Sequence, residues 1–178
     1  RNIMLTGDSA GGQLAAYSAV LMQSAQLRKT FDTVDPQMEL TALLLTSPVA
    51  FMRDGGLFSL YTKPMWGTDY KDKATYPYMD FDQIIDYAQA LPPTYLITSS
   101  GDTLANKQTH RLYEVLQAHG VQAEIKDYAK AEYDQSLPHV FSVLQPFEPA
   151  GTAAIDKTGN TVIHSQVRRL GTENRHAF

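Results

Sequence analysis

Apolar residues in this sequence gather in short runs that are separated by longer segments of mixed polarity. Leu40–Thr46 is a continuous apolar run that ends at Ser47-Pro48, which is typical of a parallel strand buried on both faces. Val121–Tyr128 alternates between apolar and polar residues, which is typical of a strand near a sheet edge. With the runs Ile3–Leu5 and Thr94–Ser100, the pattern predicts strands in four places.

Two segments between these strands repeat apolar residues at helical spacing. The first runs from Gly12 to about Leu27, and the second runs from Leu104 to His119, where Gly120 supplies a C-terminal stop. A strand, a helix and a further strand in this order form a βαβ unit. We therefore predict an α/β fold, with a mostly parallel sheet flanked by helices.

Residues 49–92 interrupt this pattern with glycines, prolines and many aromatic side chains. The segment is too long for a simple connection, and loops of that length often carry function. One interpretation is a surface excursion whose aromatic residues pack a small core of their own. The other is the wall or lid of a substrate pocket, with Phe51, Met65 and Trp66 as the first candidates to line it.

The C-terminal quarter has weaker signals. Residues 129–149 are rich in loop-forming residues and contain His139, and Thr152–Leu170 has a weak helical pattern that Gly159 interrupts. We predict one domain over residues 1–170, followed by a polar tail at 171–178.

Composition narrows the class of protein. Of 178 residues, 43% are hydrophobic and 19% charged, as in globular domains. The formal net charge of −4 gives no electrostatic support for a nucleic-acid partner, and no apolar run is long enough for a membrane span. The sequence has no cysteine, which excludes disulfides, thiolate metal sites and a cysteine nucleophile. These features fit a cytoplasmic protein.

The stretch Gly7-Asp8-Ser9-Ala10-Gly11 follows the first predicted strand and precedes the first predicted helix. This is the G-x-S-x-G nucleophile elbow, in which a sharp strand-to-helix turn exposes the serine hydroxyl above the sheet. We expect side chains at Gly7 and Gly11 to collide with the neighbouring strand and helix. The Ala10 N–H, at a helix N-terminus, is an expected oxyanion donor. The alternative is an ordinary Gly-Ser turn that caps a helix.

The run Gly7-Asp8-Ser9-Ala10-Gly11-Gly12, with Ile-Met-Leu-Thr before it and Gln-Leu-Ala-Ala after it, resembles the α/β-hydrolase superfamily. It is most similar to the hormone-sensitive-lipase-like esterases, and the resemblance extends over about residues 1–145. It implies hydrolysis of a small carboxylic ester without a metal or cofactor.

The resemblance also predicts that the chain is the C-terminal part of a longer fold. Arg1 already lies at the start of the elbow strand, which in α/β-hydrolases is near the middle of the sheet. A glycine-rich loop of the H-G-G-G type, which supplies further oxyanion donors in this family, does not occur in the sequence. We therefore expect the chain alone to be inactive or weakly active.

In this superfamily the serine is followed along the chain by an acid and then by a histidine. Asp102 comes directly after the strand that ends in Ser99-Ser100-Gly101, and His139 lies in a loop after the next strand. His139 is the predicted base for Ser9, and Asp102 the predicted partner of its second ring nitrogen. The family usually has a second acidic residue shortly after the first, and Asn106 and Lys107 stand there instead.

Other residues compete for these roles. Asp102 could instead serve as a turn or helix cap, and Asp127 and Asp134 are rival acids. The histidines other than His139 fall within or at the end of a predicted helix, or in the tail region: His110, His119, His164 and His176.

The predicted function is a carboxylic-ester hydrolase that works through an acyl-enzyme. Two alternatives stay open: another serine hydrolase of the same fold (a peptidase, amidase or lactonase), and a non-catalytic binding protein, as in the gibberellin receptors. A homo-oligomer is also left open.

Overall fold

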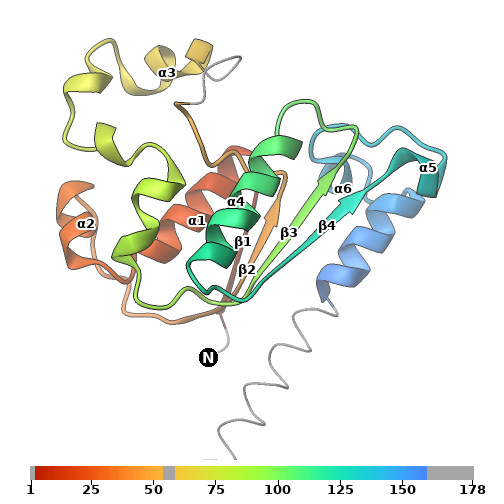
Figure 1. Cartoon of the computed structure of the whole chain (residues 1–178), viewed down its shortest axis with the longest axis horizontal. Coiled ribbons are helices and arrows are strands. Elements are labelled where there is room, and N and C mark those ends of the chain that lie inside the picture. Colours follow the sequence, from red (N-terminus) through yellow and green to blue (C-terminus); the bar gives the residue numbers. More distant parts are fainter. Residues whose placement is uncertain (1–2, 54–58, 160–178) are drawn as a thin grey trace, which may run out of the picture.

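The computed structural model describes residues 3–53 and 59–159, and its centre is a parallel sheet. Within these residues the sheet has four strands in the order β1 (Ile3–Asp8), β2 (Leu40–Thr46), β3 (Thr94–Ser99) and β4 (Ala123–Tyr128). Each adjacent pair is parallel, so every connection crosses from one end of the sheet to the other (Figure 1). The predicted α/β fold class is confirmed.

Helices cover both faces of this sheet. α1 (Ala10–Leu21) and α4 (Asn106–Ala118) pack on one face, and a helix over residues 149–159 packs on the other (Figure 1). Successive strand residues point to opposite faces. Accordingly, Leu96 packs with α1 and α4, while its neighbours Tyr95 and Ile97 pack with Ala150 and Ala154.

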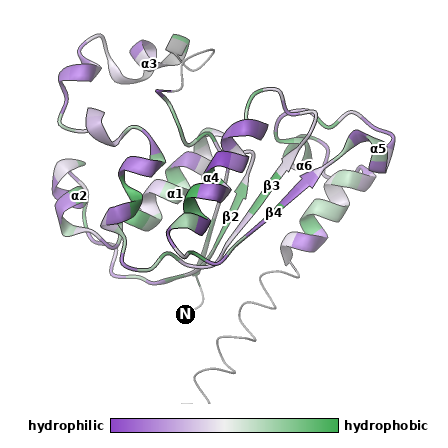
Figure 2. Ribbon diagram, viewed as in Figure 1, coloured by the Kyte–Doolittle hydropathy of each residue, from purple (hydrophilic) through white to green (hydrophobic). Residues whose placement is uncertain are grey.

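The hydropathy of the strands follows their position in the sheet. All six residues of β3 are buried, and β2 is strongly hydrophobic (Figure 2). β4 is more hydrophilic and only partly buried, as the alternating pattern predicts for a strand near a sheet edge (Figure 2). After α4, Gly120 has φ 72°, a conformation that favours glycine and ends the helix as predicted.

The first predicted helix is wrong at its C-terminal end, because two helices replace it. α1 ends at Leu21, and α2 (Ala25–Thr30) begins after Ser24. Two side chains stabilise the break. The Ser24 hydroxyl accepts a hydrogen bond from the Leu27 N–H at 3.2 Å, and Arg28 Nη1 donates to the carbonyls of Leu21 and Met22 at the end of α1.

The aromatic-rich segment begins beyond the C-terminal end of β2, and its later part runs beside α1 and α2 (Figure 1). It contains α3 (Ser59–Trp66) and short 3₁₀ turns at Tyr70–Asp72, Tyr76–Tyr78, Phe81–Gln83 and Ile85–Tyr87. Val49, Met52, Met79 and Ala105 form a small core, with Trp66, Tyr70 and Tyr76 packed against it. Some of the aromatic residues therefore pack around a small core, close to the first interpretation, but the segment shares this core with Ala105.

Contacts to α4 anchor the start of this segment. Gln108 Oε1 accepts hydrogen bonds from the N–H groups of Ala50 and Phe51, at 2.9 and 3.0 Å. The Arg111 guanidinium lies 3.9 Å from the centroid of the Phe51 ring. Arg53 is also bound to Asp80. The Asp80 carboxylate accepts hydrogen bonds from the backbone N–H and from Nε of Arg53.

At the C-terminal end, α5 (Lys130–Tyr133) and α6 (Phe141–Leu144) flank the loop that contains His139. The predicted helix at 152–170 begins earlier, at residue 149, and its part beyond residue 159 and the predicted tail lie outside the described residues. Among the helices that the structure describes, none is long and apolar enough to cross a membrane.

Candidate active site

Ser9 stands alone between β1 and α1, at the turn predicted for a nucleophile elbow. Its backbone has φ 51° and ψ −118°, a strained conformation for a residue with a side chain. Backbone hydrogen bonds to and just beyond β2 hold it there: the Ser9 N–H donates to the Thr46 carbonyl at 3.0 Å, and the Ser9 carbonyl accepts from Val49 at 3.1 Å. The adjacent strand thus stabilises the strained turn.

The glycines around Ser9 have unequal importance. A Cβ atom at Gly7 would lie 2.2 Å from the Gly11 carbonyl oxygen, so only glycine fits where β1 meets α1. The expectation for Gly11 is wrong, because a Cβ there meets nothing within 4 Å among the described residues. Gly12 is the second crowded position, since its Cβ would lie 2.9 Å from Pro48 Cβ.

Asp102 follows β3, is 2% exposed, and uses its two carboxylate oxygens differently. Oδ1 accepts hydrogen bonds from the N–H groups of Leu104 and Ala105, at 3.0 and 2.9 Å. Oδ2 lies 2.9 Å from His139 Nδ1. The turn-capping role and the contact with the histidine, treated above as alternatives, therefore occur together in one side chain.

His139 lies between Asp102 and Ser9. Its Nε2 is 2.9 Å from Ser9 Oγ, while Nδ1 contacts Asp102 at the same distance. Where Nδ1 carries the ring proton, it donates to Asp102 Oδ2. In the neutral ring, Nε2 then has the lone pair that accepts from the Ser9 hydroxyl.

The rival residues have other partners. His110 Nε2 lies 2.8 Å from Asp127 Oδ2, and His119 contacts the Val115 carbonyl and Asp86. Asp134 ends α5 in a left-handed conformation, with φ 48°. His164 and His176 lie outside the described residues. In the part of the chain that the structure describes, no three His, Asp or Glu side chains gather as metal ligands would.

Ala10 is the first residue of α1, directly after Ser9. The first N–H groups of a helix have no partner within the helix, and the helix dipole favours negative charge near them. The first turn of α1 contains no acidic side chain that would oppose such a charge. The Ala10 N–H is thus in a position that suits an oxyanion donor.

A cavity of about 250 Å³ opens beside Ala10, between α1 and the aromatic-rich segment. One face of α1 forms one wall, and aromatic side chains dominate the other. The lining residues are Ala10, Gln13, Leu14, Tyr17, Ser18, Leu21, Phe31, Trp66, Tyr70, Lys73, Thr75, Tyr76, Tyr78 and Met79. Burial raises the pKa of Tyr17 far above its usual range, so the α1 wall stays uncharged even at alkaline pH.

The predicted pocket residues have different positions. Trp66 lines the cavity. Phe51 does not, because it is fully buried in the main core beneath Arg111. The side chain of Met65 lies outside what the structure describes. The α1 wall was not predicted from the sequence, although Ala10, Gln13, Leu14 and Tyr17 have the spacing of one helix face.

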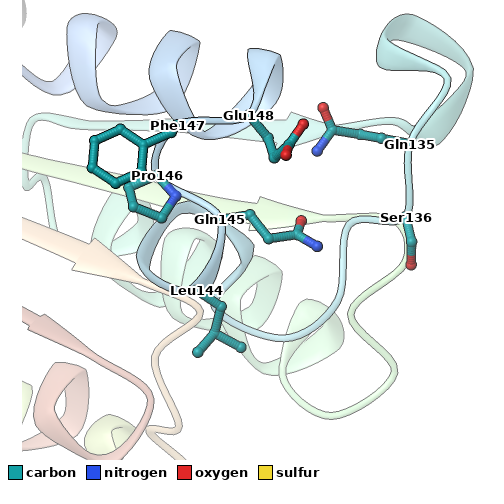
Figure 3. A pocket seen from close by; sticks show the side chains of 7 residues that line it. All are labelled: Gln135, Ser136, Leu144, Gln145, Pro146, Phe147 and Glu148. Carbon is teal, nitrogen blue, oxygen red and sulfur yellow. The ribbon is translucent and has the colours of Figure 1, made fainter.

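A second hollow, of about 280 Å³, lies between the segment that leads to His139 and the end of α6 (Figure 3). Its lining comes from two short stretches, Gln135–Ser136 and Leu144–Glu148, and includes none of Ser9, Asp102 and His139. Phe147 stands at its rim with 95% of its surface exposed.

Comparison with known proteins supplies a family. A family model described as "alpha/beta hydrolase fold" matches residues 1–136. Esterase B from Lactobacillus rhamnosis, in a structure with a tributyrin phosphonate, superposes with a TM-score of 0.85 at 27% identity. That alignment covers 97% of this chain and 55% of esterase B.

A second structure of esterase B gives the same TM-score of 0.85 at 26% identity, covering 97% of this chain and 56% of that one. The esterase Est2 from Thermogutta terrifontis, with propionate bound, has a TM-score of 0.58 at 19% identity, over 91% of this chain and 55% of Est2, and shows a shared fold. A sequence search of curated proteins returned no match. The chain spans about 55% of the length of esterase B. Because the family model matches more than two thirds of its residues, the chain belongs to the hormone-sensitive-lipase-like group of the α/β-hydrolase family.

Proposed function

We propose that this chain carries the catalytic triad of a carboxylic-ester hydrolase, with Ser9 as nucleophile, His139 as general base and Asp102 as the acid that orients it. The observation that carries the proposal is the continuous contact Ser9 Oγ–His139 Nε2 and His139 Nδ1–Asp102 Oδ2, with 2.9 Å at each step. Those side chains come from three separate parts of the sequence, and their order matches the superfamily.

In the proposed reaction, His139 Nε2 removes the Ser9 hydroxyl proton while Oγ attacks the ester carbonyl. The imidazolium then donates this proton to the leaving alkoxide as the C–O bond breaks, which releases the alcohol and leaves an acyl-serine. Water attacks the acyl-serine with His139 again as base, and the proton returns to Ser9 Oγ. Asp102 is 2% exposed, so its carboxylate faces the imidazolium with little screening by solvent.

The Ala10 N–H is the proposed first oxyanion donor. Further donors are expected in the part of the fold that this chain does not cover, since the chain spans about 55% of esterase B. Loss of one donor typically lowers the rate by about 10²–10³. The proposed enzyme is therefore the full-length protein, and residues 1–178 alone should be inactive or weakly active.

The cavity beside Ala10 is the proposed acyl pocket. A methylene group takes roughly the space of one water molecule, about 30 Å³. The cavity of about 250 Å³ therefore fits about eight carbons, which favours short and medium acyl chains. The structure of esterase B inhibited by a C4-C4 tributyrin phosphonate supports the same class.

The test is hydrolysis of p-nitrophenyl butyrate by the full-length protein, its Ser9→Ala variant and residues 1–178 alone. Ser9→Ala should abolish both turnover and labelling by a fluorophosphonate, while Ser100→Ala, which alters an exposed serine near the site, should retain both. Folded protein that neither turns over any ester nor reacts with the fluorophosphonate would refute the proposal and favour a binding role. Turnover of amides or lactones in preference to esters would shift it to another serine hydrolase of this fold.

A further inference from the structure

The Ser99 hydroxyl takes no part in the reaction proposed above, yet it joins the two segments that carry Asp102 and His139. Ser99 is the last residue of β3 and is fully buried. Its Oγ donates a hydrogen bond to the Leu137 carbonyl at 2.6 Å. Along the chain, Ser99 lies three residues before Asp102, and Leu137 lies two residues before His139.

Two hydrogen bonds therefore close a small ring between strand and loop. One is Ser99 Oγ to the Leu137 carbonyl, and the other joins His139 Nδ1 to Asp102 Oδ2. The loop side of the ring contains Pro138, whose φ is fixed by its own ring. With little freedom between Leu137 and His139, the position of the Leu137 carbonyl constrains that of the imidazole.

The strand side of the ring is held firmly. The Asn106 side-chain amide donates to the Ser99 carbonyl and to Asp127, both at 2.9 Å, and the Ser100 N–H donates to Tyr128 on β4. Gly101 also lies against the loop, because a Cβ there would be 2.7 Å from the Leu137 oxygen. Ser99 thus presents its hydroxyl from a fixed point, and the Leu137 carbonyl has little room to move toward the strand.

The loop on the other side of His139 is strained. Val140 has φ 53°, which a β-branched residue rarely adopts. Such a conformation persists only where the surrounding contacts determine it. A loop under strain relaxes when a contact is lost, so removal of the Ser99 hydroxyl should let His139 move away from Ser9 and Asp102.

We propose that Ser99 is a positioning residue, which holds the His139 loop against the strand that carries Asp102. The kinetic test of this inference rests on the proposed function. The structural part, that Ser99 holds the His139 loop in place, is independent of it. The neighbouring Thr98 supplies a matched control, since its buried hydroxyl has no hydrogen-bond partner among the described residues.

The experiment compares Ser99→Ala and Thr98→Val in the full-length protein, with p-nitrophenyl butyrate as substrate and circular dichroism as the check on folding. Ser99→Ala should lower kcat about 10- to 100-fold with KM within about twofold of wild type, because a misplacement of a catalytic group by a fraction of an ångström slows the chemistry. Thr98→Val should leave both constants unchanged. A merely structural Ser99 would lower the melting temperature and leave kcat intact.

A folded Ser99→Ala variant with wild-type kcat overturns the positioning role of Ser99. The proposed function stands in that case, because the wild-type protein is active. Should Ser99→Ala not fold, Ser99→Cys retains a weak donor and should lose about 3- to 10-fold in kcat, and full kcat in that variant overturns the proposal. If the wild-type protein itself has no activity, the proposed function fails, and amide hydrogen exchange then tests the positioning role of Ser99. The amides of residues 139–141 should exchange faster in Ser99→Ala than in Thr98→Val. Equal exchange rates overturn the inference.

Discussion

Replacing Gly7 by alanine is the most direct test of how the turn at Ser9 is built. A Cβ at Gly7 would lie 2.2 Å from the Gly11 carbonyl oxygen, 2.4 Å from its carbon and 2.7 Å from the Gly12 nitrogen. All three are backbone atoms, so no side-chain rotation relieves the clash. To reach even 3.0 Å, β1 and the start of α1 must separate by about 0.8 Å.

That separation acts on Ser9, which lies between the two elements. Overpacking of this kind costs roughly 1–3 kcal/mol or more. For a chain of this size, 3 kcal/mol corresponds to a fall of about 6–12 °C in melting temperature. The Ser9–His139 contact of 2.9 Å would also be lost, and a displacement near 1 Å costs about 10²-fold in rate. We expect Gly7→Ala to be both less stable and at least 100-fold less active.

Gly11→Ala is the matched control, in the same turn and with the same added methyl group. Its Cβ meets nothing within 4 Å among the described residues, and alanine favours a helix over glycine by about 1 kcal/mol. In urea unfolding of the 178-residue chain, Gly11→Ala should equal or exceed wild type while Gly7→Ala falls below it. Equal stability and activity for Gly7→Ala and wild type would refute the steric reasoning.

Three further predictions concern the pocket, the sheet and the anchored segment. Trp66→Ala should raise kcat/KM for p-nitrophenyl decanoate relative to the octanoate about tenfold, since the decanoyl chain has two more methylenes to bury, which contribute about 1.6 kcal/mol. An unchanged ratio would mean that the indole does not limit the pocket. Burial raises the pKa of Tyr95 above its usual value near 10, so its neutral form stabilises the fold below pH 10 and this contribution is lost as the pH rises further. Tyr95→Phe should therefore match wild type in unfolding free energy at pH 7 and lose less of this free energy above pH 10. An equal decrease in both proteins above pH 10 would show that Tyr95 is not the group responsible. Gln108→Leu should lower the unfolding free energy by about 3 kcal/mol, because two buried N–H groups lose their acceptor. Gln108→Glu retains an acceptor and should lower the unfolding free energy less. Equal decreases for the two variants would mean that packing, not the hydrogen bonds, accounts for the effect.

Much of the fold follows from local pattern. The run Leu40–Thr46 corresponds residue for residue to β2, because a continuous apolar segment of this length is stable only when both of its faces are covered. The turn at Ser9 was likewise recognisable, since the order of strand, glycine-flanked serine and helix is encoded within a dozen residues. The break between α1 and α2 was not, because Arg28 stabilises it from beyond the break by binding carbonyls at the end of α1.

The candidate site, like the fold, was predicted from the sequence only in part. Sequence order and the family resemblance were enough to nominate Ser9, Asp102 and His139, since parallel strands bring their C-terminal ends to one edge of the sheet. The contacts between these residues, the burial of Phe51 in the core and the wall that α1 contributes to the cavity depend on how distant segments pack. The bond from Ser99 to Leu137 is of this kind too, because a hydroxyl at the end of a strand has no partner until a loop 38 residues away folds over it.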